Sequence, residues 1–182
     1  MKRLNKQEDK SYEFLFGYEE SYGYLAGTHA RDKDAVVSSL LICEMAVKAK
    51  AEGKTLVDKI NELYDKYGFY LDALDTFTLK GKDGLERINS IMKQLRTNGT
   101  PFADTESVTD YETEIYEAPF GLLPKSNVLK YNMQDGSWIA IRPSGTKPKI
   151  KIYYSIKCEN KSLAEQKLEG YREMIRNSIA LD

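Results

Sequence analysis

The sequence predicts an α/β (α+β) protein made of two small subdomains. In the first half, short strand patterns alternate with segments of helical apolar periodicity, which indicates a mixed α/β sheet unit. Beyond Pro101 the pattern changes to strands separated by turn signals, and the chain ends in one helical stripe. We therefore expect the second subdomain to be an antiparallel sheet with helices packed on one face.

The first subdomain is predicted to begin with a strand, a loop and a long helix. Residues 12–16 are aromatic and aliphatic, and the glycine-bounded stretch 17–23 is typical of an exposed loop. From Asp34 to about Lys50, apolar residues cover a wide helical face, and Asp34 suits the positive end of the helix dipole. Because the apolar face is so wide, we expect this helix to be largely buried.

A second helix, a strand and a third helix should follow. Thr55 and Asp58 have the spacing of a capping box for a helix that ends at Gly68. Residues 69–79 alternate as in a strand, and residues 85–95 carry another helical stripe. We place the boundary between the subdomains within residues 68–84. The predicted domains are residues 1–75 and residues 76–182, the latter including the linker.

The second subdomain is predicted to be a sheet packed on the last helix. Residues 128–133 and 138–141 flank Asp135 and Gly136, a pair that favours a tight hairpin turn. Residues 149–157 alternate, with isoleucines and a tyrosine on one face and lysines on the other. Ser162 and Glu165 predict a capping box for the carboxy-terminal helix, whose apolar stripe should cover the sheet.

The charge balance and apolar runs limit the partners. The chain has 27 basic and 28 acidic residues, a formal net charge of −1 and no basic block, so nucleic acid is a poor candidate partner. No apolar run approaches the roughly 20 residues needed to span a bilayer, and the first ten residues lack the apolar run of a signal peptide. We expect no membrane contact and a cytoplasmic location. Cys43 and Cys158 are far apart, which argues against a disulfide framework or zinc site, and both are expected to be buried thiols.

Residues 142–149 have the chemistry of a phosphate-binding loop. They supply a guanidinium, two hydroxyls, a glycine and two lysines: Arg142, Ser144, Thr146, Gly145, Lys147 and Lys149. Arginine presents a planar fork of donors that matches a phosphate, and glycine lets backbone N–H groups converge on an anion. A solvent-exposed turn between two strands would also explain the proline and glycine residues.

Two segments near the amino terminus are candidates for binding a sugar. Glu19, Glu20 and Ser21 lie on the glycine-bounded loop, where paired carboxylates can accept hydrogen bonds from neighbouring hydroxyls. Arg31 and Lys33 precede the first long helix, where an anion is favoured and where a neighbouring cation is expected to lower the pKa of Lys33. Solvated acidic residues and an ordinary charged helix start are the simpler interpretations.

Together, residues 16–24, 31–34 and 142–146 resemble three motifs of the α-D-phosphohexomutases, in the family's order and at compatible separations. The resemblance is to the bacterial phosphoglucomutase and phosphomannomutase branch, and it extends over nearly the whole chain. It implies that residues 1–75 are the carboxy-terminal part of the family's third domain. Residues 76–182 would then hold the linker and the fourth domain.

The resemblance also implies a role for each loop. Sugar hydroxyls would be held by Glu19, Glu20 and Ser21, with Arg31 adding positive charge and Lys33 a candidate general acid or base. The non-reacting phosphate of a hexose phosphate would be held by Arg142, Ser144, Gly145, Thr146 and Lys149. At the position after Thr146 the family usually has glutamate, and Lys147 reverses that charge, which would strengthen anion binding or alter a partner contact.

The remainder of the family's machinery is expected outside this sequence. The family reaction uses a phosphoserine in the first domain and an aspartate-rich Mg²⁺ loop in the second, and neither pattern is found here. The resemblance therefore implies an inactive substrate-binding fragment that needs the missing amino-terminal domains, with Mg²⁺ bound there, no metal in this chain, and a sugar bisphosphate as activator and intermediate. Two alternatives stay open: a free-standing, non-catalytic phosphosugar-binding module, or a mutase for another sugar phosphate such as that of glucosamine or a pentose.

Overall fold

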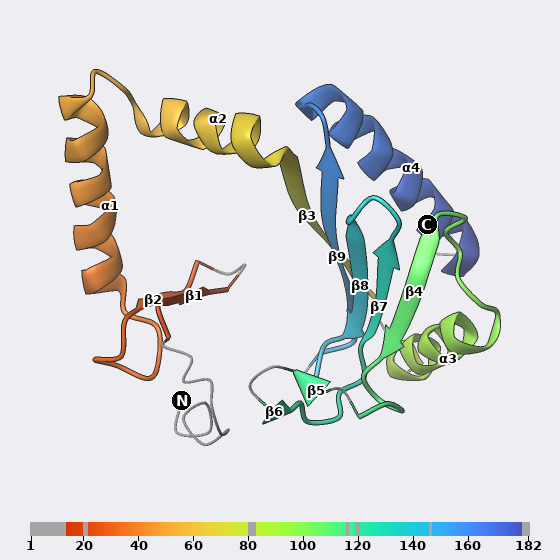
Figure 1. Ribbon diagram of the computed structural model, residues 1–182. Helices are drawn as coiled ribbons and strands as arrows, with labels where there is room; N and C mark the ends of the chain where they lie inside the picture. Colours follow the sequence, from red (N-terminus) through yellow and green to blue (C-terminus); the bar gives the residue numbers. More distant parts are fainter. Residues whose placement is uncertain are drawn as a thin grey trace. The chain divides into compact units, whose positions relative to one another are not determined.

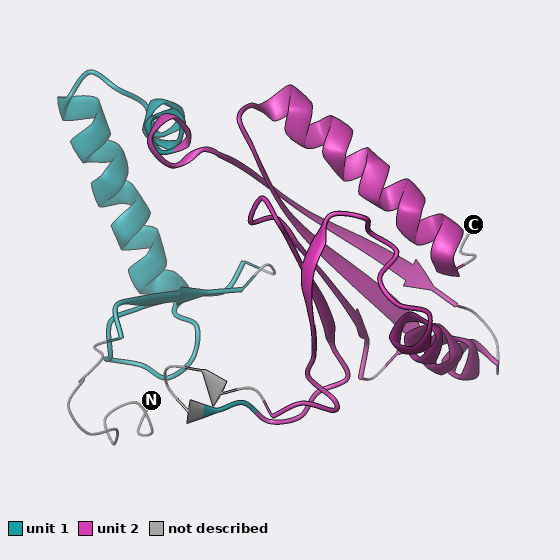
Figure 2. Ribbon diagram, turned by 45° about the vertical axis from the view of Figure 1, so that its right-hand side comes forward, with its two compact units in different colours: residues 1–63, 117–123 teal, residues 64–116, 124–182 magenta. Residues whose placement is uncertain are grey.

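The computed structural model describes residues 14–19, 22–79, 83–115, 117–118, 121–145 and 147–179 (Figure 1). Within these ranges the chain forms four helices, one five-stranded antiparallel sheet and two small two-stranded sheets, so the predicted α/β class is confirmed. The chain divides into two compact units (Figure 2). The first unit is Met1–Leu63 with Glu117–Leu123, and the second is Tyr64–Tyr116 with Pro124–Asp182.

The first unit contains a short hairpin followed by a long helix. Strand β1 (Phe16–Tyr18) pairs antiparallel with β2 (Tyr24–Ala26), a strand that the sequence analysis did not anticipate. Helix α1 (Ala35–Ala51) begins after Asp34. The Asp34 carboxylate accepts hydrogen bonds from the backbone N–H groups of Val36 at 2.9 Å and Val37 at 3.1 Å. The helix is therefore fixed by its cap at the predicted position.

The expectation that α1 is largely buried is wrong for this chain. Ala49 is the one buried residue of the helix, whereas Val36 is 81% and Val47 is 70% exposed. Ala49 is also the one buried apolar side chain among the described residues of the first unit. The helix has the composition of a buried element, but the described part of the unit offers no apolar layer to cover it.

Helix α2 (Leu56–Tyr67) starts with the predicted capping box. The Asp58 amide donates to the Thr55 hydroxyl at 3.1 Å, and the Thr55 amide donates to the Asp58 carboxylate at 2.7 Å. The division between the two units falls inside this helix. Strand β3 (Phe69–Thr78) then pairs along its whole length within the second unit. The assignment of residues 1–75 and 76–182 to two family domains stays a prediction.

The second unit is built on a five-stranded antiparallel sheet. Its order is β3–β9–β8–β7–β4, formed by β4 (Thr105–Asp110), β7 (Leu129–Met133), β8 (Trp138–Pro143) and β9 (Lys149–Cys158) in addition to β3. The predicted hairpin turn is confirmed, because Gly136 joins β7 to β8 with a φ of 87°. The short strands β5 (Glu117–Ala118) and β6 (Gly121–Leu122) pair with each other and group with the first unit.

Helices α3 (Gly84–Thr97) and α4 (Lys161–Ile179) pack on one face of this sheet (Figure 1). The core joins the inward side chains of the strands to both helices, and it includes Ile139, Ile141, Ile150, Ile152, Ile156, Met92, Leu168 and Ile175. The predicted cap of α4 is wrong. Asn160, rather than Ser162, accepts from a backbone N–H of the first turn, at 3.0 Å, and Glu165 lies 3.7 Å from the Lys161 ammonium.

Among the described residues, no helix is long and apolar enough to cross a membrane, and no three histidine, cysteine or acidic side chains are grouped to hold a metal ion. Both cysteines are free thiols, as expected. Their expected burial is wrong for Cys43, which is exposed on the uncovered helix α1, and Cys158 is half-buried.

Candidate functional site

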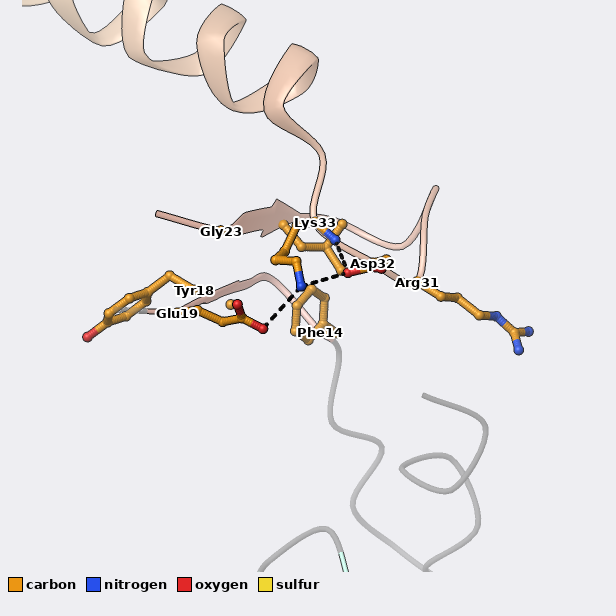
Figure 3. A pocket seen from close by; sticks show the side chains of 9 residues that line it. Phe14, Tyr18, Glu19, Gly23, Arg31, Asp32 and Lys33 are labelled. Atoms are coloured by element: carbon orange, nitrogen blue, oxygen red, sulfur yellow. Dashed lines mark hydrogen bonds and ion pairs between the residues drawn. The ribbon is translucent and has the colours of Figure 1, made fainter. Parts of the chain in front are cut away.

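An open depression on the first unit gathers most of the predicted sugar-binding residues that the structure describes (Figure 3). It is lined by Phe14, Gly17, Tyr18, Glu19, Gly23, Leu25, Arg31, Asp32 and Lys33. Its volume is about 210 Å³. Pockets that enclose a small ligand are usually about 300 Å³ or larger. The depression is therefore smaller than a pocket that encloses a small ligand.

Lys33 is the centre of this depression. Its ammonium lies 3.3 Å from the Glu19 carboxylate and 3.2 Å from that of Asp32 (Figure 3). Gly23 makes this arrangement possible, because a Cβ at that position would lie 2.1 Å from Cδ of Lys33. The glycine-bounded loop thus allows the lysine side chain to extend across it toward Glu19.

The charge state of Lys33 corrects the expectation drawn from the sequence. Hydrogen bonds to Asp32 and then Glu19 raise the pKa of Lys33, whereas the sequence analysis expected a lowered pKa. The pKa of Asp32 is lowered, chiefly because its carboxylate accepts a hydrogen bond from the Lys33 backbone N–H. In this arrangement Lys33 is a protonated ammonium group at neutral pH. It is suited to donating hydrogen bonds or a proton rather than to accepting a proton.

The remaining residues predicted near this site are not in contact with Lys33 in the described structure, or lie outside the described residues. Arg31 lines the depression, but its guanidinium points away from the Lys33–Glu19 pair (Figure 3). Glu20 and Ser21 lie outside the described residues. His29 is 2.9 Å from the Asp34 carboxylate, and this hydrogen bond is the main reason that the pKa of Asp34 is lowered. His29 therefore helps to fix the cap of α1.

The second candidate site is the loop between β8 and β9. Arg142 is exposed near the end of β8, and the loop is closed by the Ser144 amide, which donates to the Lys149 carbonyl at 2.8 Å. A Cβ built at Gly145 meets no atom within 4 Å, and this residue does not have positive φ. Among the described residues, packing therefore does not require glycine at this position. Thr146 lies outside the described residues.

Lys151 is a functional candidate that the sequence analysis missed. In the register of β8 and β9 it lies directly opposite Arg142. Side chains at such positions have Cβ atoms about 5 Å apart, so the two cations are close enough to contact one anion. The alternation of lysines along β9 was visible in the sequence, but only the strand pairing shows which lysine faces the arginine.

Comparisons with known proteins identify the family to which both loops belong. The sheet and the second loop lie within residues 44–173, which match the phosphoglucomutase/phosphomannomutase C-terminal domain. The chain belongs to the phosphoglucomutase/phosphomannomutase family. Residues 2–67 match the alpha/beta/alpha domain III of the same family. The resemblance to the carboxy-terminal portion of an α-D-phosphohexomutase is thus confirmed.

Similar proteins in this family are much longer than the chain. It is 39% identical over 174 residues to a phosphoglucomutase of Staphylococcus aureus, a match covering 91% of this chain and 31% of the relative. A phosphoglucomutase of Staphylococcus epidermidis is 39% identical over 168 residues, covering 85% and 30%. The chain therefore spans less than a third of the length of these relatives. The crystal structure of parafusin, a phosphoglucomutase from Paramecium, in its open form, shares the fold with a TM-score of 0.69 at 17% identity, covering 88% of this chain and 29% of that one.

Proposed function

We propose that this chain is the substrate-holding carboxy-terminal part of a mutase that interconverts hexose 1-phosphate and hexose 6-phosphate. The phosphoryl group would pass through a phosphoserine that lies outside this chain. The observation that carries the proposal is the exposed loop of Arg142, which stands on the sheet of a phosphoglucomutase/phosphomannomutase C-terminal domain with Lys151 directly opposite. A guanidinium beside an ammonium favours a phosphate over a neutral ligand.

The second loop would hold the phosphate that is not being transferred. Arg142 supplies a planar pair of donors, Ser144 and Gly145 lie next to it, and Lys149 and Lys151 supply further charge from β9. Thr146 joins this set through the family resemblance. Phosphoryl transfer depends mainly on positioning and on stabilising charge, so a loop that fixes the far end of the substrate contributes to the rate.

The first loop would hold the sugar. Glu19 is proposed to accept hydrogen bonds from ring hydroxyls, together with Glu20 and Ser21, and Arg31 to add positive charge nearby. Lys33 is already hydrogen-bonded to Glu19 and carries a raised pKa, so its proposed role is that of a proton donor or a charged donor to the substrate. The mutase reaction requires a sugar phosphate in two opposite orientations, and each loop would then meet either end of the substrate.

The remaining parts of the enzyme are proposed to come from outside this chain. The exposed apolar side chains of α1 would be covered by further strands of domain III, because that domain is an alpha/beta/alpha structure and the described residues provide no such layer. The described residues do not fit a Mg²⁺ site, since they form no cluster of acidic ligands. We place Mg²⁺, the phosphoserine and the site of the activating sugar bisphosphate in the amino-terminal domains, and the enzyme in the cytoplasm.

Calorimetric titration of the chain with glucose 1-phosphate and glucose 6-phosphate tests this proposal. We expect weak binding that falls at least 10-fold in Arg142→Ala, because a charge-assisted pair is lost. Lys93→Ala on the exposed side of α3 is the control for removing one positive charge. A mutase assay on the same chain should show no turnover.

Equal binding by the wild-type chain and Arg142→Ala would overturn the assignment of the loop. Turnover by the chain alone would overturn the placement of the nucleophile outside it. In the complete enzyme the same substitution should lower kcat/KM by about 10- to 1000-fold, since it removes an interaction with a phosphate that is present throughout the reaction.

A further inference from the structure

Strand β3 is an edge of the five-stranded sheet, and one side of its backbone points away from that sheet. It pairs with β9 at all ten positions from Phe69 to Thr78 without a register shift. One position beyond the strand, the Leu79 N–H donates to the Pro148 carbonyl at 3.0 Å. Because backbone groups alternate in direction along a strand, the odd-numbered residues bond to β9 and the even-numbered residues point their N–H and C=O groups outward. The outward residues are Tyr70, Asp72, Leu74, Thr76 and Thr78.

The two edges of the sheet differ in how they are protected. Short length, bulges, prolines and lysines keep natural edge strands from pairing with another chain. The opposite edge strand, β4, has six residues and a register shift between Thr105 and Ser107. β3 has ten residues, no register shift, no proline and no lysine. In the part of the chain that the structure describes, no other segment donates to or accepts from its outward backbone groups.

Apolar side chains are incompletely covered on both faces of this edge. On the face opposite α3 and α4, Tyr70 is 41% and Leu74 is 40% exposed. On the other face, Leu71 and Phe77 pack against the core but are only partly buried. A strand added at this edge would therefore remove apolar surface from water on both faces at once.

The outward residues of β3 are complementary to those of a second β3. An antiparallel copy related by a two-fold axis at Leu74 would pair all of its outward residues with outward residues of the first strand. Leu74 would then face Leu74, and Asp72 would face Thr76. Tyr70 would face Thr78. An axis moved to Asp72 would instead oppose two carboxylates, which is destabilising.

The same register suits the inner face of the sheet. It places Leu71 opposite Phe77, so that two partly buried apolar side chains meet on each side of the axis. Ala73 would face Asp75, whose carboxylate already accepts from the Arg172 guanidinium at 2.9 and 3.0 Å. The charge of Asp75 is thus balanced within its own copy and does not oppose the pairing.

We propose that β3 is a dimerisation edge, where a second copy of this chain adds its own β3 antiparallel with Leu74 on the two-fold axis. Each outward pair exchanges two hydrogen bonds, so the pairing forms about ten. A typical protein interface contains about ten direct hydrogen bonds. The inference goes beyond the proposed function, does not involve the loop of Arg142 and requires no mutase activity.

Sedimentation equilibrium over a dilution series tests the proposal. The mass should rise with concentration from 20.8 kDa toward twice that value. Leu74→Lys should raise the dissociation constant of the dimer by about 10-fold or more, because two ammonium groups would lie directly opposite each other. Leu74→Pro should do the same, since it removes an outward N–H and no hydrogen bond to β9. Val108→Lys, at a 43% exposed position of β4, is the matched control and should have no effect.

Two further variants and an exchange measurement test the register. Thr76→Glu should weaken the dimer because it faces Asp72 of the second copy, whereas Thr76→Lys should strengthen it by about 3-fold. Amide exchange followed by NMR gives a backbone readout. The amides of Leu74 and Thr76 should exchange more slowly as the concentration rises, while that of Ala73, already bonded to β9, should not change.

Each outcome decides for or against this edge. A mass of 20.8 kDa at every concentration would overturn the proposal. A dimer that keeps its affinity in Leu74→Lys, with circular dichroism showing an intact fold, would also overturn it and would place the contact elsewhere, such as on the exposed apolar side chains of α1. Dimerisation through β3 without binding of either hexose phosphate would support the edge and contradict the mutase assignment, and a monomer that binds hexose phosphate through Arg142 would do the reverse.

Discussion

The two units of this chain differ in what holds their elements in place. The second unit has a continuous core in which isoleucines from two strands, β8 and β9, pack with residues of α3 and α4. The first unit has regular secondary structure and well-formed caps, yet Ala49 is its one buried apolar side chain among the described residues. Caps and local periodicity determine where a helix begins, whereas its stability in a protein comes mostly from packing an apolar face. The second unit should therefore be stable by itself, and the first should depend on atoms outside it.

The ion pairs show the same contrast. In the second unit, Arg96 forms a two-pronged contact with Asp110, and Arg172 forms one with Asp75, all with largely covered side chains. In the first unit, the pair between Lys54 and Glu62 is much more exposed. Exposed pairs contribute about 0–1 kcal/mol, while charged hydrogen bonds that are partly buried contribute more. The ion pairs of the second unit are therefore more buried than the Lys54–Glu62 pair of the first unit, and they should contribute more to stability.

The most direct way to break this comparison is to remove the same atoms from each unit. Ile152→Ala should lower the free energy of unfolding by about 2–5 kcal/mol, because Ile152 is fully buried in the sheet. Ile42→Ala should cost less than about 0.5 kcal/mol, because Ile42 is half-exposed on α1. Urea denaturation, followed by Trp138 fluorescence and by circular dichroism, measures both losses. Equal losses would mean that the two units share one core.

The sequence predicted the elements whose pattern is local. The alternation along β9, the hairpin turn at Gly136 and the capping box between Thr55 and Asp58 are all confirmed, because each depends on residues that are neighbours in the chain. Strand β2 was missed because three residues between two turns give too short a pattern for alternation to be recognised.

The sequence could not show which residues far apart along the chain contact one another in the fold. The wide apolar face of α1 led us to expect a buried helix, but Ala49 is its one buried residue, and no covering layer is present among the described residues. The pKa of Lys33 was expected to fall beside Arg31, and it rises instead because Asp32 and Glu19 accept its hydrogen bonds. Lys151 became a candidate only when the register placed it opposite Arg142.

The contribution of the Arg96–Asp110 contact to the stability of the second unit should depend on pH. The hydrogen bonds from Arg96 lower the pKa of Asp110 below its usual 3.8 in the folded state. The contact therefore stabilises the fold above about pH 4 and loses this contribution as the pH falls through the folded pKa. Asp110→Asn should reduce the free energy of unfolding by about 1–3 kcal/mol at pH 7, and by progressively less below pH 4.

Urea titrations between pH 2 and pH 7 measure this difference. Glu112→Gln is the matched control, because Glu112 lies 2.8 Å from the same guanidinium but is half-exposed, and its loss should be smaller. A difference between wild type and Asp110→Asn that stays constant across this range would show that the charge of Asp110 is not the cause.

The smallest expected effect comes from removing a helix cap in each unit. Asn160→Ala should lower the free energy of unfolding by about 1 kcal/mol, because α4 is packed on the core and its cap contributes to global stability. Asp34→Ala removes an equivalent cap from α1, which has almost no core contact, so it should leave the fluorescence-detected unfolding unchanged while speeding amide exchange in the first turn of α1. Ser162→Ala should change neither measurement, since Asn160 is the cap. A loss of global stability in Asp34→Ala would place α1 in the same cooperative unit as the sheet and would contradict the division on which the comparison rests.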